Sequence, residues 1–207
     1  MNLLLLTPYP EKLKYFLADC GDRVICSSGK VSKTFMVENK IGFVISYGYR
    51  YILTPETLSY APNNFINLHI SYLPYNRGSS PNLWSALEGT PAGVSIHKIN
   101  SGVDTGDILL QKREFFDDEM NFRETYNLLN ESLLELFREN WLDLRGLQIP
   151  PKKQIGASTS HKSNDSTFIH DSLQKGWETS LSDAKYQYAE YLRGLGYPNT
   201  RCIHGSV

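Results

Sequence analysis

The chain has 207 residues, of which 41% are hydrophobic and 21% charged, and its formal net charge is −1. This length suits one domain with a sizeable core, and the near-neutral charge gives no electrostatic reason to expect nucleic acid or an anionic membrane as a partner. The three cysteines include no CxxC pair, so the sequence suggests neither a disulfide framework nor a zinc site and fits a reducing, cytoplasmic setting. The apolar run near the N-terminus is four leucines long, far below the about 20 residues that span a membrane.

The first part of the chain alternates strands with helices. Continuous apolar or β-branched runs predict buried strands, and apolar residues at helical spacing after a proline predict helices. Residues 27–40 are polar and lack the glycine pattern of a P-loop, so we expect a solvated loop with a short helix there. The other expected elements are a strand at residues 3–6, a helix at 10–20, strands at 23–26 and 41–47, a helix at 52–58 and a strand at 65–69.

The second part continues the alternation and then changes character. A loop at residues 75–80 follows Pro74 and leads to a helix in which Ser80 is the candidate N-cap. The apolar stripe of the longest helical pattern predicts core packing. We expect a helix at residues 81–87, a strand at 92–99, a loop at 100–106, a strand at 108–110, an exposed acidic segment at 114–119, a helix at 121–144, loop-rich chain at 158–165 and a last helix at 181–195.

This order of elements predicts an α/β fold with a mostly parallel sheet flanked by helices. The expected core covers residues 1–146, and residues 147–207 form a short C-terminal appendage packed on it, because the tail has too few apolar residues for a core of its own. Residues that follow a buried parallel strand face the ligand crevice of such a sheet, which makes Tyr47, Gly48, Tyr49 and Arg50 candidates for substrate contacts. A structural role for these tyrosines at the sheet edge is equally open.

Three polar side chains have the chemistry of an acid–base site. Asn67 and His69 are two residues apart on a predicted strand, so they share one face. An imidazole exchanges protons near neutral pH, and Asp104 can orient it if the carboxyl ends of adjacent strands meet, as a doubly wound sheet predicts. Asn67 adds an amide donor for an oxygen that becomes negative in the transition state. A strand histidine taken alone is more often structural, so the prediction depends on the combination.

These residues belong to a longer pattern. In chain order it contains Asn67-Leu-His69, Leu73-Pro74, Arg77-Gly78-Ser-Ser-Pro81, Trp84, Gly93-Val94-Ser-Ile-His97 and Asp104-Thr105-Gly106. Together these motifs resemble the core signature of the formyltransferases that use 10-formyltetrahydrofolate. The stretch contains no GxSxG motif and no cysteine, which argues against a covalent acyl-enzyme and agrees with direct attack by a substrate amine.

The resemblance implies a Rossmann-like formyltransferase core with Asn67, His69 and Asp104 as the catalytic triad. In that mechanism the substrate amine attacks the formyl carbon on N10 of the folate, Asn67 and protonated His69 stabilise the oxyanion, and Asp104 supports the histidine and assists proton transfer. It also implies 10-formyltetrahydrofolate as formyl donor, no metal ion, and small-molecule partners. The residues implied for the folate, held mainly through backbone groups, are Tyr49, Ile52, Leu53, Ile99, Asn100, Gly102 and Val103. Those implied for the second substrate are Tyr9, Tyr47, Arg50, Tyr75, Arg77 and Gly78.

Departures from the family indicate the acceptor. Members acting on methionyl-tRNA carry a basic C-terminal β-barrel, the deformylases carry an N-terminal regulatory domain, and enzymes acting on glycinamide ribonucleotide carry a glycine-rich loop after the first strand; we expect none of these here. Residues 160–165 and 176–179 are similar to the HKS-x-D and GW-[DE]-T segments of enzymes that formylate nucleotide-linked sugars. The expected acceptor is therefore the amine of a nucleotide-linked dideoxy amino sugar, as used in lipopolysaccharide O-antigen biosynthesis.

Several alternatives stay open at this point. One is a formyltransferase for another small amine, such as an amino acid or a nucleotide-biosynthesis intermediate. Another is a non-catalytic folate- or nucleotide-binding module, which splayed triad residues would favour. A homodimer is also left open.

Overall fold

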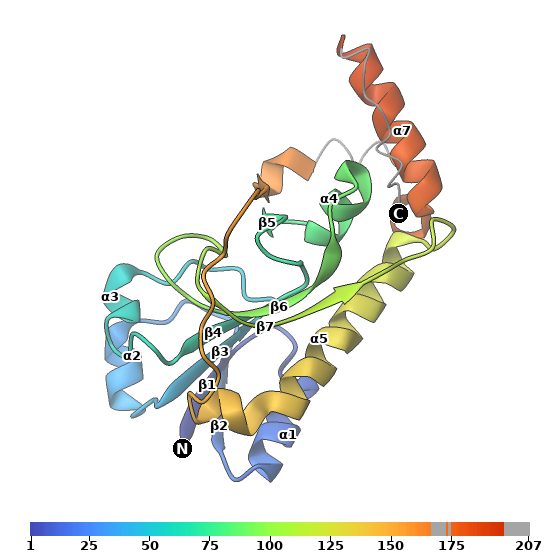
Figure 1. Ribbon diagram of the computed structural model, residues 1–207. Coiled ribbons are helices and arrows are strands. Elements are labelled where there is room, and N and C mark those ends of the chain that lie inside the picture. Colours follow the sequence, from blue (N-terminus) through green and yellow to red (C-terminus); the bar gives the residue numbers. More distant parts are fainter. Residues whose placement is uncertain (167–172, 174, 197–207) are drawn as a thin grey trace. The chain divides into compact units, whose positions relative to one another are not determined.

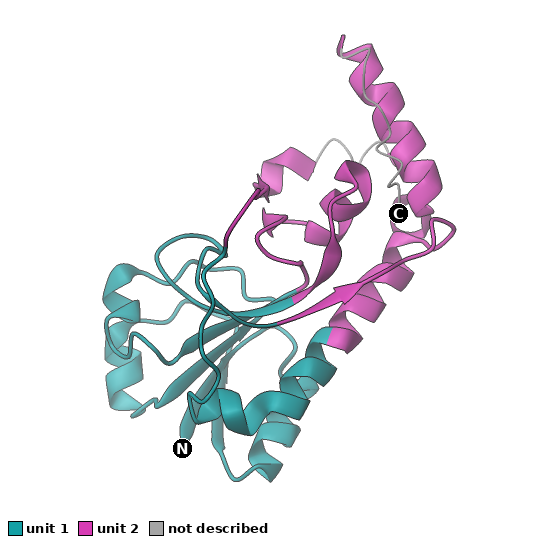
Figure 2. Cartoon of the chain, viewed as in Figure 1, with its two compact units in different colours: residues 1–69, 95–110, 133–154 teal, residues 70–94, 111–132, 155–207 magenta. Residues whose placement is uncertain are grey.

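The computed structural model of the protein describes residues 1–166, 173 and 175–196. The chain forms two compact units that interleave along the sequence (Figure 2). Unit 1 comprises Met1–His69, Ser95–Leu110 and Leu133–Gln154, and unit 2 comprises Ile70–Val94, Gln111–Ser132 and Ile155–Val207. The predicted division at residue 146 is a different partition and stays a prediction. Cys202, one of the three cysteines, lies outside the described residues.

A six-stranded sheet in the order β2-β1-β3-β4-β6-β7 forms the centre of the fold (Figure 1). β1 (Asn2–Leu6) pairs in parallel with β2 (Arg23–Ser27) and β3 (Phe43–Tyr47), and β3 pairs in parallel with β4 (Phe65–His69). β6 (Ala92–Lys98) pairs antiparallel with β4, and β7 (Ile108–Glu114) is the last strand of the order. The predicted α/β class with a mostly parallel, Rossmann-like sheet is confirmed.

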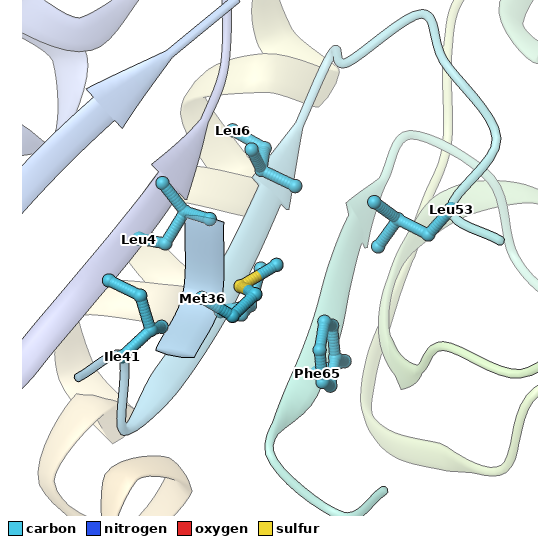
Figure 3. Packing of buried hydrophobic residues seen from close by; sticks show 7 residues of the cluster. Leu4, Leu6, Met36, Ile41, Leu53 and Phe65 are labelled. Carbon is cyan, nitrogen blue, oxygen red and sulfur yellow. The ribbon is translucent and has the colours of Figure 1, made fainter. Parts of the chain in front are cut away.

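The apolar run of β1 contributes to both faces of the sheet in unit 1, because successive side chains of a strand point to opposite sides. On one face, Leu4 and Leu6 pack with Met36 of α2 (Lys33–Glu38) and with Leu53, as Figure 3 shows. On the other face, Leu3 lies beside Phe43, whose ring meets the Trp141 indole edge to face at 5.6 Å between centroids. Burying one such leucine stabilises the fold by about 1.5–3 kcal/mol, so the two-sided core explains why β1 is apolar throughout.

The helices of unit 1 follow local sequence signals. Pro10 opens a 3-10 turn, η1 (Pro10–Lys12), and α1 (Lys14–Asp19) follows it, so the single helix predicted for residues 10–20 is interrupted. Pro55 begins α3 (Pro55–Leu58), where the Thr54 hydroxyl accepts from the Thr57 amide as the predicted cap. That helix is shorter than predicted because its pre-proline residue favours extended backbone. α5 (Phe122–Arg145) confirms the longest predicted helix, and its residues are shared between the two units.

Unit 2 contains two short strands that the sequence did not indicate. β5 (Arg77–Gly78) lies in a segment predicted as loop, and it pairs in parallel with β8 (Ser160–His161) from the loop-rich tail. Two-residue strands have no periodicity, and only a partner distant in sequence creates them. The remaining elements are α4 (Pro81–Glu88), η2 (Ser163–Ser166), η3 (Gly176–Glu178) and α7 (Leu181–Gly194).

Two further local predictions are corrected. β7 extends to Glu114, which was expected in an exposed acidic segment, and the Glu114 carboxylate accepts a hydrogen bond from Ser132. Ser80 precedes α4 but caps nothing with its side chain, because its left-handed φ of 55° turns the hydroxyl toward Ser166 instead. The apolar cluster of unit 2 packs Leu83 and Trp84 of α4 against residues of α5 and α7.

Candidate functional site

Two neighbouring strands of unit 1 present polar side chains on one face of the sheet. Asn67 and His69 are two residues apart on β4, and they therefore point the same way. β6 runs antiparallel beside β4, with His97 opposite Asn67 and Ser95 opposite His69. Side chains of directly opposed residues share a face of a sheet. The register thus brings two histidines and an asparagine together, with the ring centroids of His69 and His97 6.2 Å apart.

Asp104, from the loop between β6 and β7, completes this group. Its Oδ2 lies 3.6 Å from His69 Nε2, and its Oδ1 lies 3.1 Å from Asn67 Nδ2 and 3.3 Å from His97 Nε2. The carboxylate is mostly shielded, since only 11% of its side chain is exposed, against 10% for His69. Charges at such a site interact more strongly than charges in water. The predicted triad residues are therefore together, and the splayed arrangement of a degenerate module is not found.

His97 is a member of this group that the sequence analysis did not select as a site residue. Its Nδ1 lies 2.8 Å from the Lys98 carbonyl oxygen, which can only accept, so Nδ1 carries a hydrogen. Its Nε2 lies between two partners, 3.2 Å from Asn67 Nδ2, which is a donor, and 3.3 Å from Asp104 Oδ1, which is an acceptor. At 2% exposure His97 is the most buried of the four side chains. Its place in the Gly-Val-x-x-His motif, on the polar face of a predicted strand, was the available signal.

The loop that carries Asp104 folds back tightly on β6. Lys98 N donates to the Asp107 carbonyl at 2.9 Å, and a Cβ placed on Gly106 would lie 1.7 Å from the Lys98 carbonyl oxygen. Only glycine permits that approach. Asp104 itself has a φ of 51°, in the left-handed region that non-glycine residues seldom occupy. The Asp-Thr-Gly motif therefore provides both the carboxylate and the close turn that directs it at β4.

The path by which Asp104 reaches Asn67 and His69 differs from the predicted one. The doubly wound sheet was expected to bring the carboxyl ends of adjacent strands together, but β4 and β6 are antiparallel. β6 ends beside the start of β4, where Ile99 N donates to the Phe65 carbonyl at 2.9 Å. Asp104 reaches Asn67 and His69 because its loop turns back over the strands. The predicted juxtaposition is present, although a different path of the chain produces it.

The residues predicted for the folate lie around this loop and the segment after β3, all in unit 1. Asn100 Oδ1 accepts from Gly102 N at 3.0 Å and from the Thr105 hydroxyl at 2.8 Å, so it orders the loop. Leu53 is buried in the core of unit 1, with Tyr49 and Ile99 packed against it. Ile52 and Val103 are exposed, at 77% and 53%. The role of these residues toward the folate stays a prediction.

The residues predicted for the second substrate are divided between the units. In unit 1, Tyr9 is 42% exposed and its ring meets that of the buried Tyr47 edge to face, while Arg50 is exposed. The Tyr49 hydroxyl donates to the Gly29 carbonyl at 2.7 Å, and burial raises the pKa of this phenol. Tyr75, Arg77 and Gly78 belong to unit 2, where Arg77 and Gly78 form β5. Their role toward a substrate stays a prediction.

The described part of the chain has neither a membrane-spanning helix nor a cluster of metal-ligating side chains. No helix among the described residues is long and apolar enough to cross a membrane. Within the same residues, no group of three or more His, Cys, Asp and Glu side chains has an arrangement that could hold a metal ion. Cys20 and Cys26 are free thiols, and burial raises the pKa of Cys26.

A protein-family model described as formyl transferase matches residues 33–134 of this chain. The crystal structure of the formyltransferase PseJ from Anoxybacillus kamchatkensis, in complex with UDP-4,6-dideoxy-4-formamido-L-AltNAc and tetrahydrofolate, is 38% identical in sequence. It superposes with a TM-score of 0.84 over 89% of this chain and 100% of that chain. A sugar N-formyltransferase from Shewanella sp FDAARGOS_354 has a TM-score of 0.73 over 91% of this chain and 88% of its own, at 19% identity, and it supports the fold alone.

Curated relatives give a different acceptor in their names. The methionyl-tRNA formyltransferase of Thermodesulfovibrio yellowstonii is 38% identical over 130 residues, which is 62% of this chain and 42% of that protein. That of Clostridium botulinum is 33% identical over 129 residues, 62% of this chain and 42% of its own length. The chain thus spans less than half the length of these curated relatives.

Proposed function

The chain belongs to the formyltransferase family, and on this basis we propose that it transfers the formyl group of 10-formyltetrahydrofolate to an amine, using Asn67, His69 and Asp104. The observation that carries the proposal is the contact of Asp104 with both β4 residues, 3.6 Å to His69 Nε2 and 3.1 Å to Asn67 Nδ2. Family members crystallised with tetrahydrofolate or folinic acid support the choice of donor.

The reaction needs a base and a group that stabilises negative charge, and the site has both. The nitrogen of the amine forms a bond to the formyl carbon, whose carbonyl oxygen becomes an oxyanion. Protonated His69 donates to that oxygen, and Asp104 accepts the proton that the attacking nitrogen loses. The C–N10 bond then breaks, the carbonyl re-forms, and N10 receives the proton that Asp104 accepted, which gives tetrahydrofolate and restores the carboxylate. General acid–base catalysis of this kind contributes about 10²–10⁴-fold to a rate.

Asn67 has a role linked to the protonation of Asp104. Its Nδ2 donates to Asp104 Oδ1 at 3.1 Å and lies 3.2 Å from His97 Nε2. A carboxylate accepts more strongly than a neutral carboxyl group. When Asp104 takes the proton of the amine, the hydrogen bond that it accepts from Asn67 weakens. The released Asn67 N–H can then donate to the oxyanion. Donation therefore begins as the negative charge develops.

For the acceptor, we propose the amine of a dideoxy amino sugar carried on a nucleoside diphosphate. PseJ, whose crystal structure holds a formamido sugar nucleotide, is 38% identical to this chain, and the match covers 100% of PseJ and 89% of this chain. The tail segments at 160–165 and 176–179, which are similar to those of sugar N-formyltransferases, support the same choice. The proposal includes a cytoplasmic location and small-molecule partners. Methionyl-tRNA is the second candidate, because curated relatives bear that name, one of them at 38% identity over 130 residues.

A panel of acceptors with one donor tests this proposal. Purified protein is incubated with 10-formyltetrahydrofolate and, separately, with UDP- and dTDP-linked 4-amino-4,6-dideoxy sugars, methionyl-tRNA and free amino acids, and formylated products are identified by mass spectrometry. Among these acceptors, we expect a formylated product only from a sugar nucleotide. Turnover with methionyl-tRNA would replace the acceptor and keep the reaction type, whereas no formylated product with any amine would contradict the enzymatic proposal. An Asp104→Asn protein is the matched control.

A further inference from the structure

We propose that Gln154 is a positioning residue that holds Asp104 in its working orientation through the backbone of the loop. This role rests on the proposed function of Asp104. Gln154 Nε2 donates to the carbonyl oxygen of Asp104 at 2.8 Å and to that of Gly106 at 2.7 Å. The two carbonyls belong to the Asp-Thr-Gly motif itself. One amide group, 50 residues away along the chain from Asp104, therefore fastens both ends of that motif.

The chemistry of a primary amide suits this position. Its nitrogen carries two hydrogens, so it can donate to two carbonyl oxygens that converge on it, and each bond is of ordinary length. Asp104 has a φ of 51°, which is strained for a residue with a Cβ and persists where the surroundings hold it. The hydrogen bond to the Asp104 carbonyl oxygen holds the peptide group between Asp104 and Thr105, and this limits backbone rotation at Asp104. Gln154 thereby resists relaxation of the residue whose carboxylate faces His69.

The segment that carries Gln154 is itself fixed to the same part of unit 1. Ile108 and Lys152 exchange backbone hydrogen bonds in both directions, each 2.8 Å long, in an antiparallel bridge. Lys153 Nζ lies 3.0 Å from Asp107 Oδ1, which adds an exposed ion pair. The backbone bridge leaves the Gln154 side chain in reach of the loop. Residues 152–154 thus form a strap along residues 104–108. Through its side-chain amide, Gln154 connects this strap to the backbone carbonyl of Asp104.

The experiment compares Gln154→Glu and Gln154→Leu with Lys153→Met. The Glu variant keeps the shape but presents a carboxylate to two carbonyl oxygens, and the Leu variant removes the donor without adding charge. Lys153→Met removes the neighbouring ion pair of the same strap and leaves the two amide contacts in place. We expect kcat for formyl transfer to fall about 10- to 100-fold in both Gln154 variants, with KM for folate and for acceptor changed by less than about threefold. Lys153→Met should keep kcat within about twofold.

Amide hydrogen exchange gives a second measurement that does not depend on activity. Residues 100–107 should exchange faster in both Gln154 variants, while residues 3–6 of β1 keep wild-type protection. Unchanged exchange at 100–107, unchanged kcat, or an increase in KM with normal kcat would each overturn the positioning role. If the wild-type protein formylated no amine, the proposed function would fail, and hydrogen exchange would still decide whether Gln154 holds the Asp104 loop.

Discussion

Asn67 and His97 face each other across the antiparallel β4–β6 pair, with 3.2 Å between Asn67 Nδ2 and His97 Nε2. His97 Nδ1 donates to the Lys98 carbonyl oxygen at 2.8 Å, and His97 Nε2 faces both the Asn67 amide and Asp104 Oδ1. A backbone carbonyl thus fixes the ring orientation of a buried histidine, and the ring in turn lies against Asn67. The Asn67 side chain consequently lies between Asp104 and His97 and contacts both.

Replacing His97 should therefore affect both stability and catalysis. His97→Leu leaves the Lys98 carbonyl without its donor and removes the ring nitrogen beside Asn67 and Asp104, and we expect the free energy of unfolding to fall by about 1–3 kcal/mol. Formyl transfer should fall as well, because Asn67 loses its fixed orientation. Urea denaturation and steady-state kinetics measure the two effects. Ile96→Val, on the other face of the same strand, is the control and should cost about 0.5–1.5 kcal/mol with normal turnover.

Two aspartates in one loop provide a matched comparison. Asp104 contacts His69 at 3.6 Å, whereas Asp107 forms an ion pair with the exposed Lys153 at 3.0 Å. We expect Asp104→Asn to lower kcat by about 10²–10⁴-fold, because it removes the proton acceptor. Asp107→Asn should stay within about twofold of wild type. Equal losses in both variants would mean that the loop, and not the Asp104 carboxylate, limits the reaction.

His69 should be essential for turnover and dispensable for folding. His69→Asn and His69→Ala remove the group proposed to donate to the oxyanion, and the expected loss in kcat is again about 10²–10⁴-fold. Far-UV circular dichroism spectra at the assay temperature should match wild type, since His69 lies at the end of β4 and outside the apolar cluster around Leu4 and Leu6. Near-normal turnover by either variant would refute the mechanism.

Gly106→Ala tests the close turn of the Asp-Thr-Gly loop. The added Cβ would lie 1.7 Å from the Lys98 carbonyl oxygen and 2.6 Å from its carbon, so the backbone has to move. We expect a lower thermal midpoint and a fall in kcat of about 10²-fold, because a displacement of about 1 Å at a catalytic group can cost that much. Gly29→Ala is the control, since nothing lies within 4 Å of its added Cβ. Wild-type activity in Gly106→Ala would show that Asp104 tolerates a shifted loop.

Asp22 should determine part of the acid sensitivity of unit 1. Its burial raises the pKa, but hydrogen bonds from the N-terminal ammonium and Arg145 outweigh burial, and the net pKa lies below 3.8. A depressed pKa gives stability that is fully present above the unfolded value and is lost as the pH falls through the folded value. The stability difference between wild type and Asp22→Asn should therefore be constant from neutral pH down to about 3.8 and shrink below it. Urea denaturation at several pH values measures this difference. A difference that shrank already near pH 6 would assign the acid sensitivity to other groups.

The sequence by itself determined the strand that carries Asn67 and His69, and it indicated Asp104 as their partner. Continuous apolar or β-branched runs are local signals, so β1, β3 and β4 were predictable, and Asn67 and His69 on one face followed from their spacing. The motifs between residues 67 and 106 also identified the family. The two-residue strands β5 and β8 carried no local signal and were missed, because their pairing joins residues 77–78 to residues 160–161.

Only the tertiary structure decided how Asp104 reaches the histidine and which residues support it. The antiparallel register of β4 and β6 places His97 opposite Asn67, and the close approach of Gly106 to Lys98 turns the loop back over the strands. Gln154 gave no sequence signal, since its two bonds to the loop depend on a backbone bridge between residues 108 and 152. Such contacts join parts of the chain that are far apart in sequence. Local periodicity carries no information about them.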